Sequence, residues 1–272
     1  MTPHIDALQA TILAFVQGLT EFLPISSSGH LAMIPLLSDW PDQGLAFDCV
    51  VHLGTLTAVV AYFRVELLHM ASGFGRTISA RSWHADHDGR LAWLILIATI
   101  PVGLVGLMLK DFIELDLRSV QVIAAASIGF GLMLWWADFT DRRSKHENAW
   151  TLQDALIVGM AQALALIPGT SRSGITIMMG LLLGYDRKAA SRFSFLLAIP
   201  VIALAGALKI NDWIAQPEQA AGLTELIIGF VVSAAMAYVC IHYFLKFIER
   251  IGMGPFVIYR VALGLVLLWM VY

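Results

Sequence analysis

Charged residues are scarce in this sequence: Asp, Glu, Lys and Arg make up 14% of its 272 residues, whereas 58% are hydrophobic. Soluble globular domains carry roughly 25% charged residues, so the composition excludes an ordinary water-soluble fold. The net charge of -3 is also too small to attract a nucleic acid or a strongly acidic partner. We therefore expect a membrane protein with no nucleic-acid partner.

Cysteine is almost absent, and so is the signature of a cleaved leader. The two cysteines, Cys49 and Cys240, both lie in apolar segments, which indicates buried small side chains rather than a disulfide framework. A secretory signal requires a basic segment ahead of its apolar run, and the stretch before residue 20 has none. We expect the first hydrophobic segment to remain in the protein.

Long apolar runs recur along the sequence. Several approach the roughly 20 residues that a helix needs to cross a bilayer, and they cover 47–63, 91–109, 120–137, 193–208, 223–245 and 255–272. We interpret the intervening segments as loops, at 64–90, 110–118, 138–152, 185–192, 209–222 and 246–254. The pattern predicts an all-α polytopic membrane protein that forms a single domain over 1–272.

A polar break interrupts the hydrophobic sequence twice. Residues 5–37 contain Pro-Ile-Ser-Ser-Ser-Gly-His at 24–30, and residues 153–184 contain Pro-Gly-Thr-Ser-Arg-Ser-Gly-Ile-Thr at 168–176. Each stretch is too long for one helical crossing and too short for two. This length predicts a hairpin of helices that enters the membrane, turns near its middle and leaves on the same side.

The two breaks match each other at an offset of 145 residues. Five pairs of identical residues align: Gln17 with Gln162, Leu19 with Leu164, Ser26 with Ser171, Ser28 with Ser173, and Gly29 with Gly174. Each half, about 1–138 and about 150–272, is therefore predicted to be one re-entrant hairpin followed by three crossings. Three is odd, so the second half would be inverted relative to the first, as in membrane proteins that bind a ligand at the midplane.

Lys and Arg are distributed unevenly between alternate loops. If loop 64–90 is cytoplasmic, the loops on its side hold twelve Lys and Arg residues, and those on the other side hold only Lys110, Arg118 and Lys209. Positive residues gather on the cytoplasmic side of membrane proteins. The bias predicts that both termini are periplasmic and that the two hairpins enter from opposite faces.

The first break follows a pair of polar residues on one helix face. Gln17 and Glu21 are four residues apart, so their side chains are neighbours. A carboxylate at this depth is costly unless it is paired, protonated or functional; otherwise Glu21 would serve only to accept bonds from freed backbone N–H groups. His30, across the break, is placed either to form an acid–base couple with Glu21 or to be a satisfied interior histidine.

Hydroxyl groups are concentrated at both breaks. One serine would suffice to cap the helix after the first break, whereas Ser26, Ser27 and Ser28 together with helix N-terminal amides suit a phosphate. In the second break Arg172 is a bidentate donor of the kind that binds phosphate. Alternatively, Arg172 could form an ion pair with Glu21. Both interpretations hold if Arg172 pairs with Glu21 in the resting state and phosphate competes with Glu21 for the guanidinium.

These motifs resemble those of the undecaprenyl-diphosphate phosphatase family, the bacitracin-resistance type. The resemblance rests on the Gln17-x-x-x-Glu21 segment leading into 24–30 and on 168–176, and it extends to 193–200 and 255–260. It implies a membrane phosphoric anhydride hydrolase that converts the C55 isoprenoid diphosphate to undecaprenyl phosphate, the lipid carrier for peptidoglycan synthesis. It also implies a bacterial inner-membrane location and a site open to the periplasmic side.

The resemblance further implies a divalent cation, Mg²⁺ or Ca²⁺, with Glu21 as its candidate ligand. Bacitracin would compete for the substrate rather than bind the protein, and a homodimer stays open. By position the resemblance assigns catalysis to Glu21, Ser27, His30 and Arg172. Substrate binding is assigned to Gln17, Ser26, Ser28, Gly29, Ser171, Ser173, Gly174 and Thr176.

Three questions stay open at this point. Either Ser27 or a water held there attacks the terminal phosphorus, and either Glu21 or His30 is the general base. The alternative function is a carrier that moves polyprenyl phosphate across the bilayer through the same midplane site.

Overall fold

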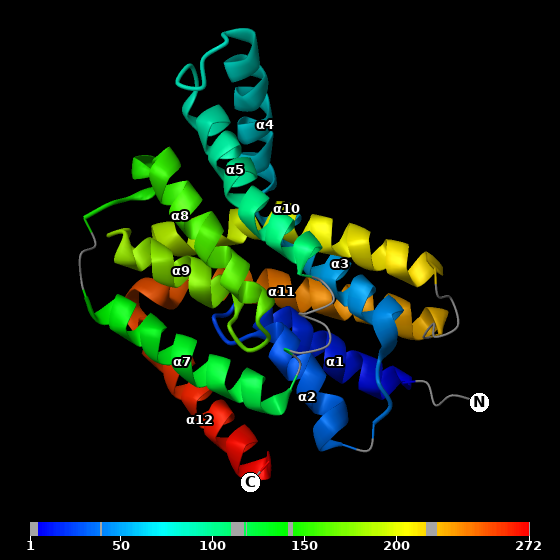
Figure 1. Cartoon of the computed structure of the whole chain (residues 1–272). Helices are drawn as coiled ribbons and strands as arrows, with labels where there is room; N and C mark the ends of the chain where they lie inside the picture. The colour runs from blue at the N-terminus through cyan, green and yellow to red at the C-terminus, as the bar shows by residue number, and fades with distance from the viewer. Residues whose placement is uncertain are drawn as a thin grey trace.

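The computed structural model describes residues 5–38, 40–109, 117, 119–140, 144–215 and 222–271. Within these ranges the protein is built from helices and has no sheet (Figure 1). The α-helices are α1 (Ala7–Thr20), α2 (Ser27–Leu37), α3 (Gly44–Tyr62), α4 (Arg64–Ser79), α5 (His87–Met108), α7 (Val120–Phe139), α8 (Leu152–Gln162), α9 (Arg172–Leu182), α10 (Arg187–Ala215), α11 (Leu223–Ile251) and α12 (Gly254–Val271). Two 3₁₀ turns, η1 (Glu147–Ala149) and η2 (Ala163–Leu166), flank α8.

Six of these helices are long and apolar enough to cross a membrane: α3, α5, α7, α10, α11 and α12. They correspond one to one with the six predicted crossings. Large apolar side chains such as Trp135, Trp136 and Trp269 are exposed on these helices, as expected for side chains that face lipid. The chain is a multi-pass helical membrane protein.

Both predicted hairpins are present as pairs of short helices. α1 and α2 have 14 and 11 residues, and α8 and α9 have 11 residues each. At 1.5 Å per residue these helices measure about 16–21 Å, too short to cross some 30 Å of hydrocarbon. The turns of the two hairpins lie next to each other (Figure 1), and the Ser173 hydroxyl of one bonds to the Leu23 carbonyl of the other.

The interpretation of 64–90 as a loop is wrong, because α4 occupies 64–79. Its mean hydropathy is low, so a search for apolar runs passes over it. α4 packs against the first part of α5, and the two helices project from the body (Figure 1). The contact is close at Gly73 and Gly89, where a Cβ on Gly89 would come 2.3 Å from the Gly73 oxygen. Asp86 caps α5 and also pairs with Arg76 at 2.6 Å.

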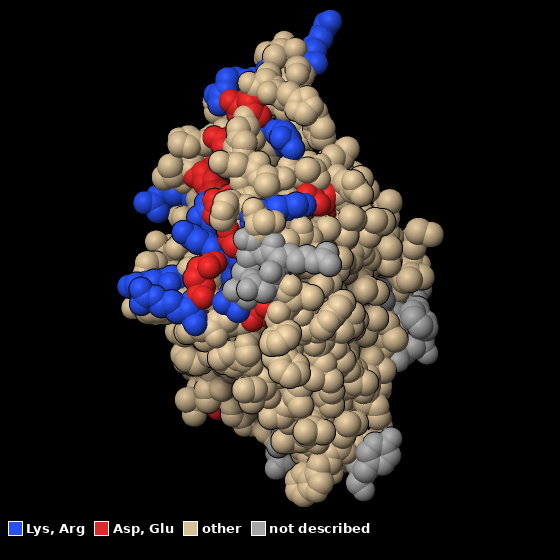
Figure 2. All heavy atoms as spheres, turned by 90° about the vertical axis from the view of Figure 1, so that its left-hand side faces the viewer, with Lys and Arg blue, Asp and Glu red and all other residues tan. Residues whose placement is uncertain are grey.

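The loops predicted to share one side do lie at one end of the molecule. Arg192 on α10 pairs with Glu66 of α4 and with Glu147 of η1, both at 2.6 Å. Arg187 pairs with Asp138 at the end of α7 and donates to the backbone oxygen of Glu249 on α11. On the face in Figure 2 charged side chains gather toward the projecting helices, and most of the remainder is uncharged.

The opposite end carries a different ion pair. Lys209 near the end of α10 lies 3.7 Å from Asp48 near the start of α3. This places Lys209 away from the cluster around Arg192, as the loop tally predicts. Lys110, Arg118, Arg142 and Arg143, which also enter that tally, lie outside the described residues.

Helix α1 is fixed by close packing against α11. A Cβ on Gly18 would lie 2.6 Å from the Ser233 oxygen and 2.7 Å from the Met236 Cβ, so only glycine allows this approach. The Cys240 thiol adds a bond to the Leu19 carbonyl at 3.2 Å. The last turn of α1, which leads into the first break, is thus held in place by a membrane-spanning helix.

Candidate active site

The two breaks share an unusual backbone conformation. Ser26, immediately before α2, has φ 71°, and Ser171, immediately before α9, has φ 70°. Positive φ at a residue other than glycine costs on the order of 1–3 kcal/mol and is concentrated at functional sites. The hydroxyls also pair alike, Ser26 with Ser28 at 3.5 Å and Ser171 with Ser173 at 3.2 Å. Two segments 145 residues apart therefore share a positive φ and a pairing of serine hydroxyls.

The two hairpin tips touch through side chains. The Ser173 hydroxyl donates to the Leu23 carbonyl at 2.8 Å. Arg172 donates through Nη2 to Oε1 of Glu21 at 2.9 Å, although 151 residues separate them. The predicted proximity of Arg172 and Glu21 is confirmed.

The Glu21 carboxylate is buried and accepts hydrogen bonds from three side chains. Besides Arg172, the Gln17 amide donates to Oε2 at 2.8 Å, as expected for residues four apart on α1. The Ser27 hydroxyl donates to the same Oε2 at 2.6 Å. Its single hydrogen therefore points at the carboxylate, so the Ser27 oxygen has its lone pairs free on the other side.

The Arg172 guanidinium is only partly used by the protein. Its Nη2 bonds to Glu21, and its face lies over the Phe22 ring with Cζ 5.8 Å from the centroid. Its Nη1 is buried and has no hydrogen-bond partner in the described part of the chain, and neither have Oγ1 of Thr170 and Oε1 of Gln17. A buried donor without a partner costs about 1–3 kcal/mol, which a bound anion would recover at Nη1.

A second buried arginine, Arg260 on α12, holds the two tips in place. Its side chain donates to five backbone carbonyls, those of Pro24 at the first tip, Gly169 and Thr170 at the second, and Ala126 and Ser127 on α7. The side chain passes so close to Gly174 that a Cβ there would lie 2.8 Å from Nη1. An arginine within the last apolar run is predicted to bond to backbone or to a neighbouring helix, and this prediction is confirmed; that its partners include both hairpin tips is not evident from the sequence.

His30 does not bond to Glu21 in the described contacts. Its Nδ1 lies 2.7 Å from the Ser26 carbonyl, which can only accept, so Nδ1 carries the hydrogen. In the neutral ring Nε2 is then an acceptor, and it bonds to the Tyr259 hydroxyl of α12. The two rings also stack, with planes 9° apart. Tyr259 is a further member of the site that sequence motifs do not reveal.

We expect Tyr259→Phe to slow turnover by about tenfold, because one side-chain hydrogen bond contributes about 1–1.5 kcal/mol. The variant keeps the stacked ring and loses only the bond to Nε2 of His30. The measurement is kcat and KM for a diphosphate substrate. Tyr238→Phe, which changes an exposed tyrosine of α11, is the matched control and should behave as the unchanged protein; equal rates for both variants would remove Tyr259 from the site.

The remaining predicted residues are placed as follows. Ser28 is exposed and Gly29 is buried at the start of α2. The Ser171 hydroxyl caps α9 by accepting from the Gly174 amide at 3.1 Å, whereas Ser26 makes no such cap. The Thr176 hydroxyl bonds to the Arg172 carbonyl and to Ser194 at 2.7 Å, so it ties α9 to α10.

The described residues offer little for a resident metal ion. No group of three or more His, Cys, Asp or Glu side chains comes together among them. Mg²⁺ and Ca²⁺ require six or more oxygen ligands, but Mg²⁺ often takes one or two carboxylates and completes its shell with substrate phosphates and water. Glu21 and the unpartnered Oε1 of Gln17 fit that shared arrangement and do not fit a closed protein cage.

Comparison with known proteins gives a consistent result. A family model described as "Bacitracin resistance protein BacA" matches residues 10–266. The chain is 54% identical over 266 residues to "Undecaprenyl-diphosphatase 2" of Stutzerimonas stutzeri, covering 97% of both chains. It is 51% identical to "Undecaprenyl-diphosphatase" of Thioalkalivibrio sulfidiphilus and of Nitrosococcus oceani, over 97% of this chain and 99% of each relative. With the paired hairpins and the polar junction between their tips, these matches show that the chain belongs to the bacitracin resistance protein BacA family.

Proposed function

We propose that this protein hydrolyses undecaprenyl diphosphate to undecaprenyl phosphate and inorganic phosphate. Relatives that are 51–54% identical over nearly the full length are named for this activity. One structural observation carries the proposal to these residues: Arg172 and Ser27 bond to the two oxygens of one buried carboxylate, Glu21, and Nη1 of Arg172 has no partner among the described residues. This arrangement combines an anion binder, a nucleophile and a base.

Arg172 would bind the terminal phosphate through Nη1 and keep its bond to Glu21 through Nη2. Because Ser26 does not cap α2, amides of the first turn of that helix add donors near the positive end of the helix dipole. Phosphoryl transfer depends mainly on such positioning and on neutralising charge at the transferred group. The two hairpin tips would therefore bind the transition state together.

Ser27 is the favoured nucleophile. Its oxygen would form a bond to the terminal phosphorus while the anhydride bond breaks and undecaprenyl phosphate leaves. The hydroxyl proton would pass to Oε2 of Glu21, 2.6 Å away, and water would then release phosphate from the serine. Glu21 rather than His30 would act as the base, because Nε2 of His30 is occupied by Tyr259. Rapid quenching with substrate labelled in the terminal phosphate should trap phosphoserine; its absence at all times would favour direct attack by water.

A divalent ion would be held by Glu21 and Gln17 together with diphosphate oxygens, and would neutralise charge on the substrate. We expect a chelator to lower the rate, and Mg²⁺ or Ca²⁺ to restore it. Because the ion is shared with the substrate, chelation should leave the melting temperature of the substrate-free protein unchanged. A fall in that temperature would instead indicate a resident structural ion.

The molecule would sit in the bacterial inner membrane with the Arg192 end in the cytoplasm. Both termini would then be periplasmic, and the α1–α2 and α8–α9 hairpins would enter from opposite faces as halves of an inverted repeat. The shared conformation of Ser26 and Ser171 supports a repeat. A reporter fused after Tyr272 that is active only in the cytoplasm should be silent; activity there would reverse this orientation.

The decisive experiment is phosphate release from undecaprenyl diphosphate by the purified protein in detergent. We expect stoichiometric phosphate and undecaprenyl phosphate, and inhibition by bacitracin that excess substrate relieves. Binding without release would point to the carrier alternative, which none of the relatives' names supports.

A further inference from the structure

The two-step hydrolysis that we propose needs a second proton acceptor. In the first step Glu21 takes the proton of Ser27, and it must return that proton to the Ser27 oxygen when the bond from serine to phosphorus breaks. Glu21 is therefore not free to take a proton from the attacking water in the same step. His30 cannot replace it, because its Nε2 is bonded to Tyr259. The second step calls for another base.

His52 is a histidine inside the membrane-spanning helix α3, and the phosphate chemistry leaves it unused. Ionisable side chains in such helices are rare and mark functional sites by default. Its Nδ1 lies 2.7 Å from the Asp48 carbonyl, which can only accept, so Nδ1 carries the hydrogen. In the neutral ring Nε2 is then an acceptor, and it makes no hydrogen bond within the described part of the chain. His52 thus has an open position for a proton.

His52 belongs to a polar face of this largely apolar helix. Asp48, His52 and Thr55 are spaced four and three residues apart, so they lie on one side of α3. The Thr55 hydroxyl donates to the His52 carbonyl at 2.9 Å, and Asp48 lies 3.7 Å from Lys209. The face therefore leads from an ion pair at the Lys209 end to the fully buried Thr55. Between them His52 is partly exposed, as a side chain that exchanges protons with water must be.

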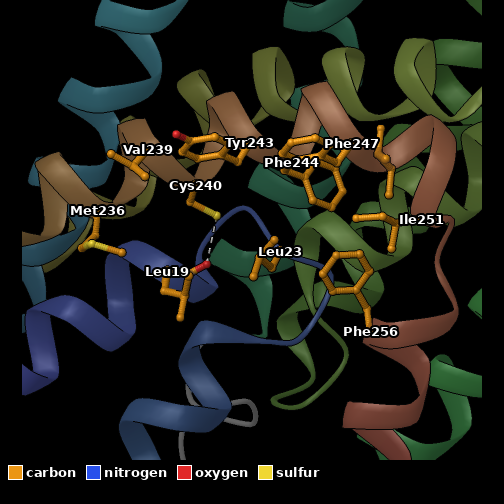
Figure 3. A pocket seen from close by; sticks show the side chains of 11 residues that line it. Leu19, Leu23, Met236, Val239, Cys240, Tyr243, Phe244, Phe247, Ile251 and Phe256 are labelled. Carbon is orange, nitrogen blue, oxygen red and sulfur yellow. Dashed lines mark hydrogen bonds between the residues drawn. The ribbon is translucent and has the colours of Figure 1, made fainter.

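Packing against α11 brings α1 and α3 together. Gly18 of α1 and Gly54 of α3 both lie against Ser233 of α11, since a Cβ on either glycine would overlap that residue. Glu21 follows Gly18 by three residues, and His52 precedes Gly54 by two. Figure 3 shows the end of α1 next to α11, with a dashed line for the bond that joins them. One helix therefore positions the segments that carry Glu21 and His52.

The Glu21 carboxylate interacts electrostatically with Arg172 and with His52. Arg172 is bonded to it directly at 2.9 Å, whereas no hydrogen bond joins it to His52 within the described residues. Because electrostatic interactions weaken with distance, His52 belongs to the surroundings of Glu21 without touching it. A phosphate on Ser27, whose hydroxyl is 2.6 Å from Glu21, and one water would fit this relation.

We infer that His52 is the base that takes a proton from the attacking water in the second step, an inference that rests on the proposed function. The water oxygen would form a bond to phosphorus as the bond from phosphorus to the Ser27 oxygen breaks. One water proton would pass to Nε2 of His52, the other would stay on the phosphate, and Glu21 would return its proton to Ser27. His52 would then release its proton to bulk water, which completes the turnover.

The variant His52→Asn tests the inference. The asparagine amide can keep the bond to the Asp48 carbonyl, but it places nothing at the position of Nε2. We expect kcat for undecaprenyl diphosphate to fall by about 10²-fold, a usual contribution of a general base. The value of kcat/KM should stay unchanged, because it reports the steps up to the formation of phosphoserine. His242→Asn, at an exposed histidine of α11, is the matched control and should behave as the unchanged protein.

Rapid quenching gives a readout that a purely structural role of His52 would not move. With substrate labelled in the terminal phosphate, His52→Asn should accumulate a nearly stoichiometric amount of phosphoserine, and the unchanged protein only a small fraction. A normal kcat, or an equal fall of kcat and kcat/KM without accumulation, would overturn the inference while the unchanged protein still releases phosphate. No release by the unchanged protein would instead refute the proposed function.

Chemical rescue keeps the inference testable if His52→Asn does not fold. Added imidazole should raise the turnover of His52→Ala and shorten the lifetime of its phosphoserine. It should not restore Ser27→Ala, which has no hydroxyl to carry the phosphate. A folded His52→Ala protein that does not respond to imidazole would exclude His52 as the base.

Discussion

Arg172→Ala should reduce phosphate release by at least about 10³-fold, the loss found when an arginine that stabilises a transferring phosphoryl group is removed. The reason is local: Arg172 is the described cation that joins the two hairpin tips through Glu21, and its Nη1 is the donor left for a ligand. The assay is the initial rate of phosphate release from undecaprenyl diphosphate in detergent. The enzyme concentration is chosen so that a rate about 10⁴ times below that of the unchanged protein is still detected.

Two further variants show whether the effect is chemical. Arg172→Lys keeps a counter-ion for the buried Glu21 carboxylate but lacks the planar pair of donors, so we expect a folded protein with a loss of about 10²-fold. Arg192→Ala removes an arginine that is also paired with glutamates, at the far end of the molecule, and should leave the rate nearly unchanged. Turnover by a folded Arg172→Ala protein near the normal rate would defeat the assignment.

Hydrophobic runs and polar interruptions were sufficient to predict the membrane-spanning helices and both hairpins, because these features depend on length and composition. The pairing of Glu21 with Arg172 was also predictable, since an isolated charge in hydrocarbon needs a partner. Helix α4 was missed because the mean hydropathy of residues 64–79 is low, so a search for apolar runs does not detect them. The helix packs closely against α5 at Gly73 and Gly89, a contact that the sequence does not reveal.

The part of the candidate site that α12 supplies was only partly predictable, because an arginine in an apolar run is expected to bond to backbone or a neighbouring helix, but nothing in the sequence says which. Tyr259 and Arg260 are more than 80 residues from the second break, and each acts through a contact that only the fold creates. Tyr259 occupies the nitrogen of His30 that a couple with Glu21 would need, which is why the proposal takes Glu21 as the base. The contact between Glu21 and Ser27 follows more directly from the sequence, because Ser27 is six residues from Glu21 and the break folds it back onto the carboxylate.

Arg260→Met should destabilise the protein by about 3–5 kcal/mol, the usual cost of removing one partner from a buried charged network. Arg260 is 1% exposed, and its five carbonyl partners belong to three separate segments. Methionine fills much of the same space but donates nothing, so the carbonyls of Pro24, Gly169 and Thr170 would lose the donor that they share. In a bilayer interior no bulk water can replace it.

The expected result is a fall in melting temperature on the order of 10 °C, since 1 kcal/mol corresponds to roughly 2–4 °C in a chain of this size class. Arg250→Met, at an exposed arginine near the end of α11, is the matched control and should melt as the unchanged protein does. Because Arg260 bonds to both tips, its loss should also separate Arg172 from Glu21, so phosphate release at a temperature below the transition should fall as well. A variant that melts normally and retains activity would show that other contacts, such as the bond from Ser173 to Leu23, suffice to hold the two hairpins together.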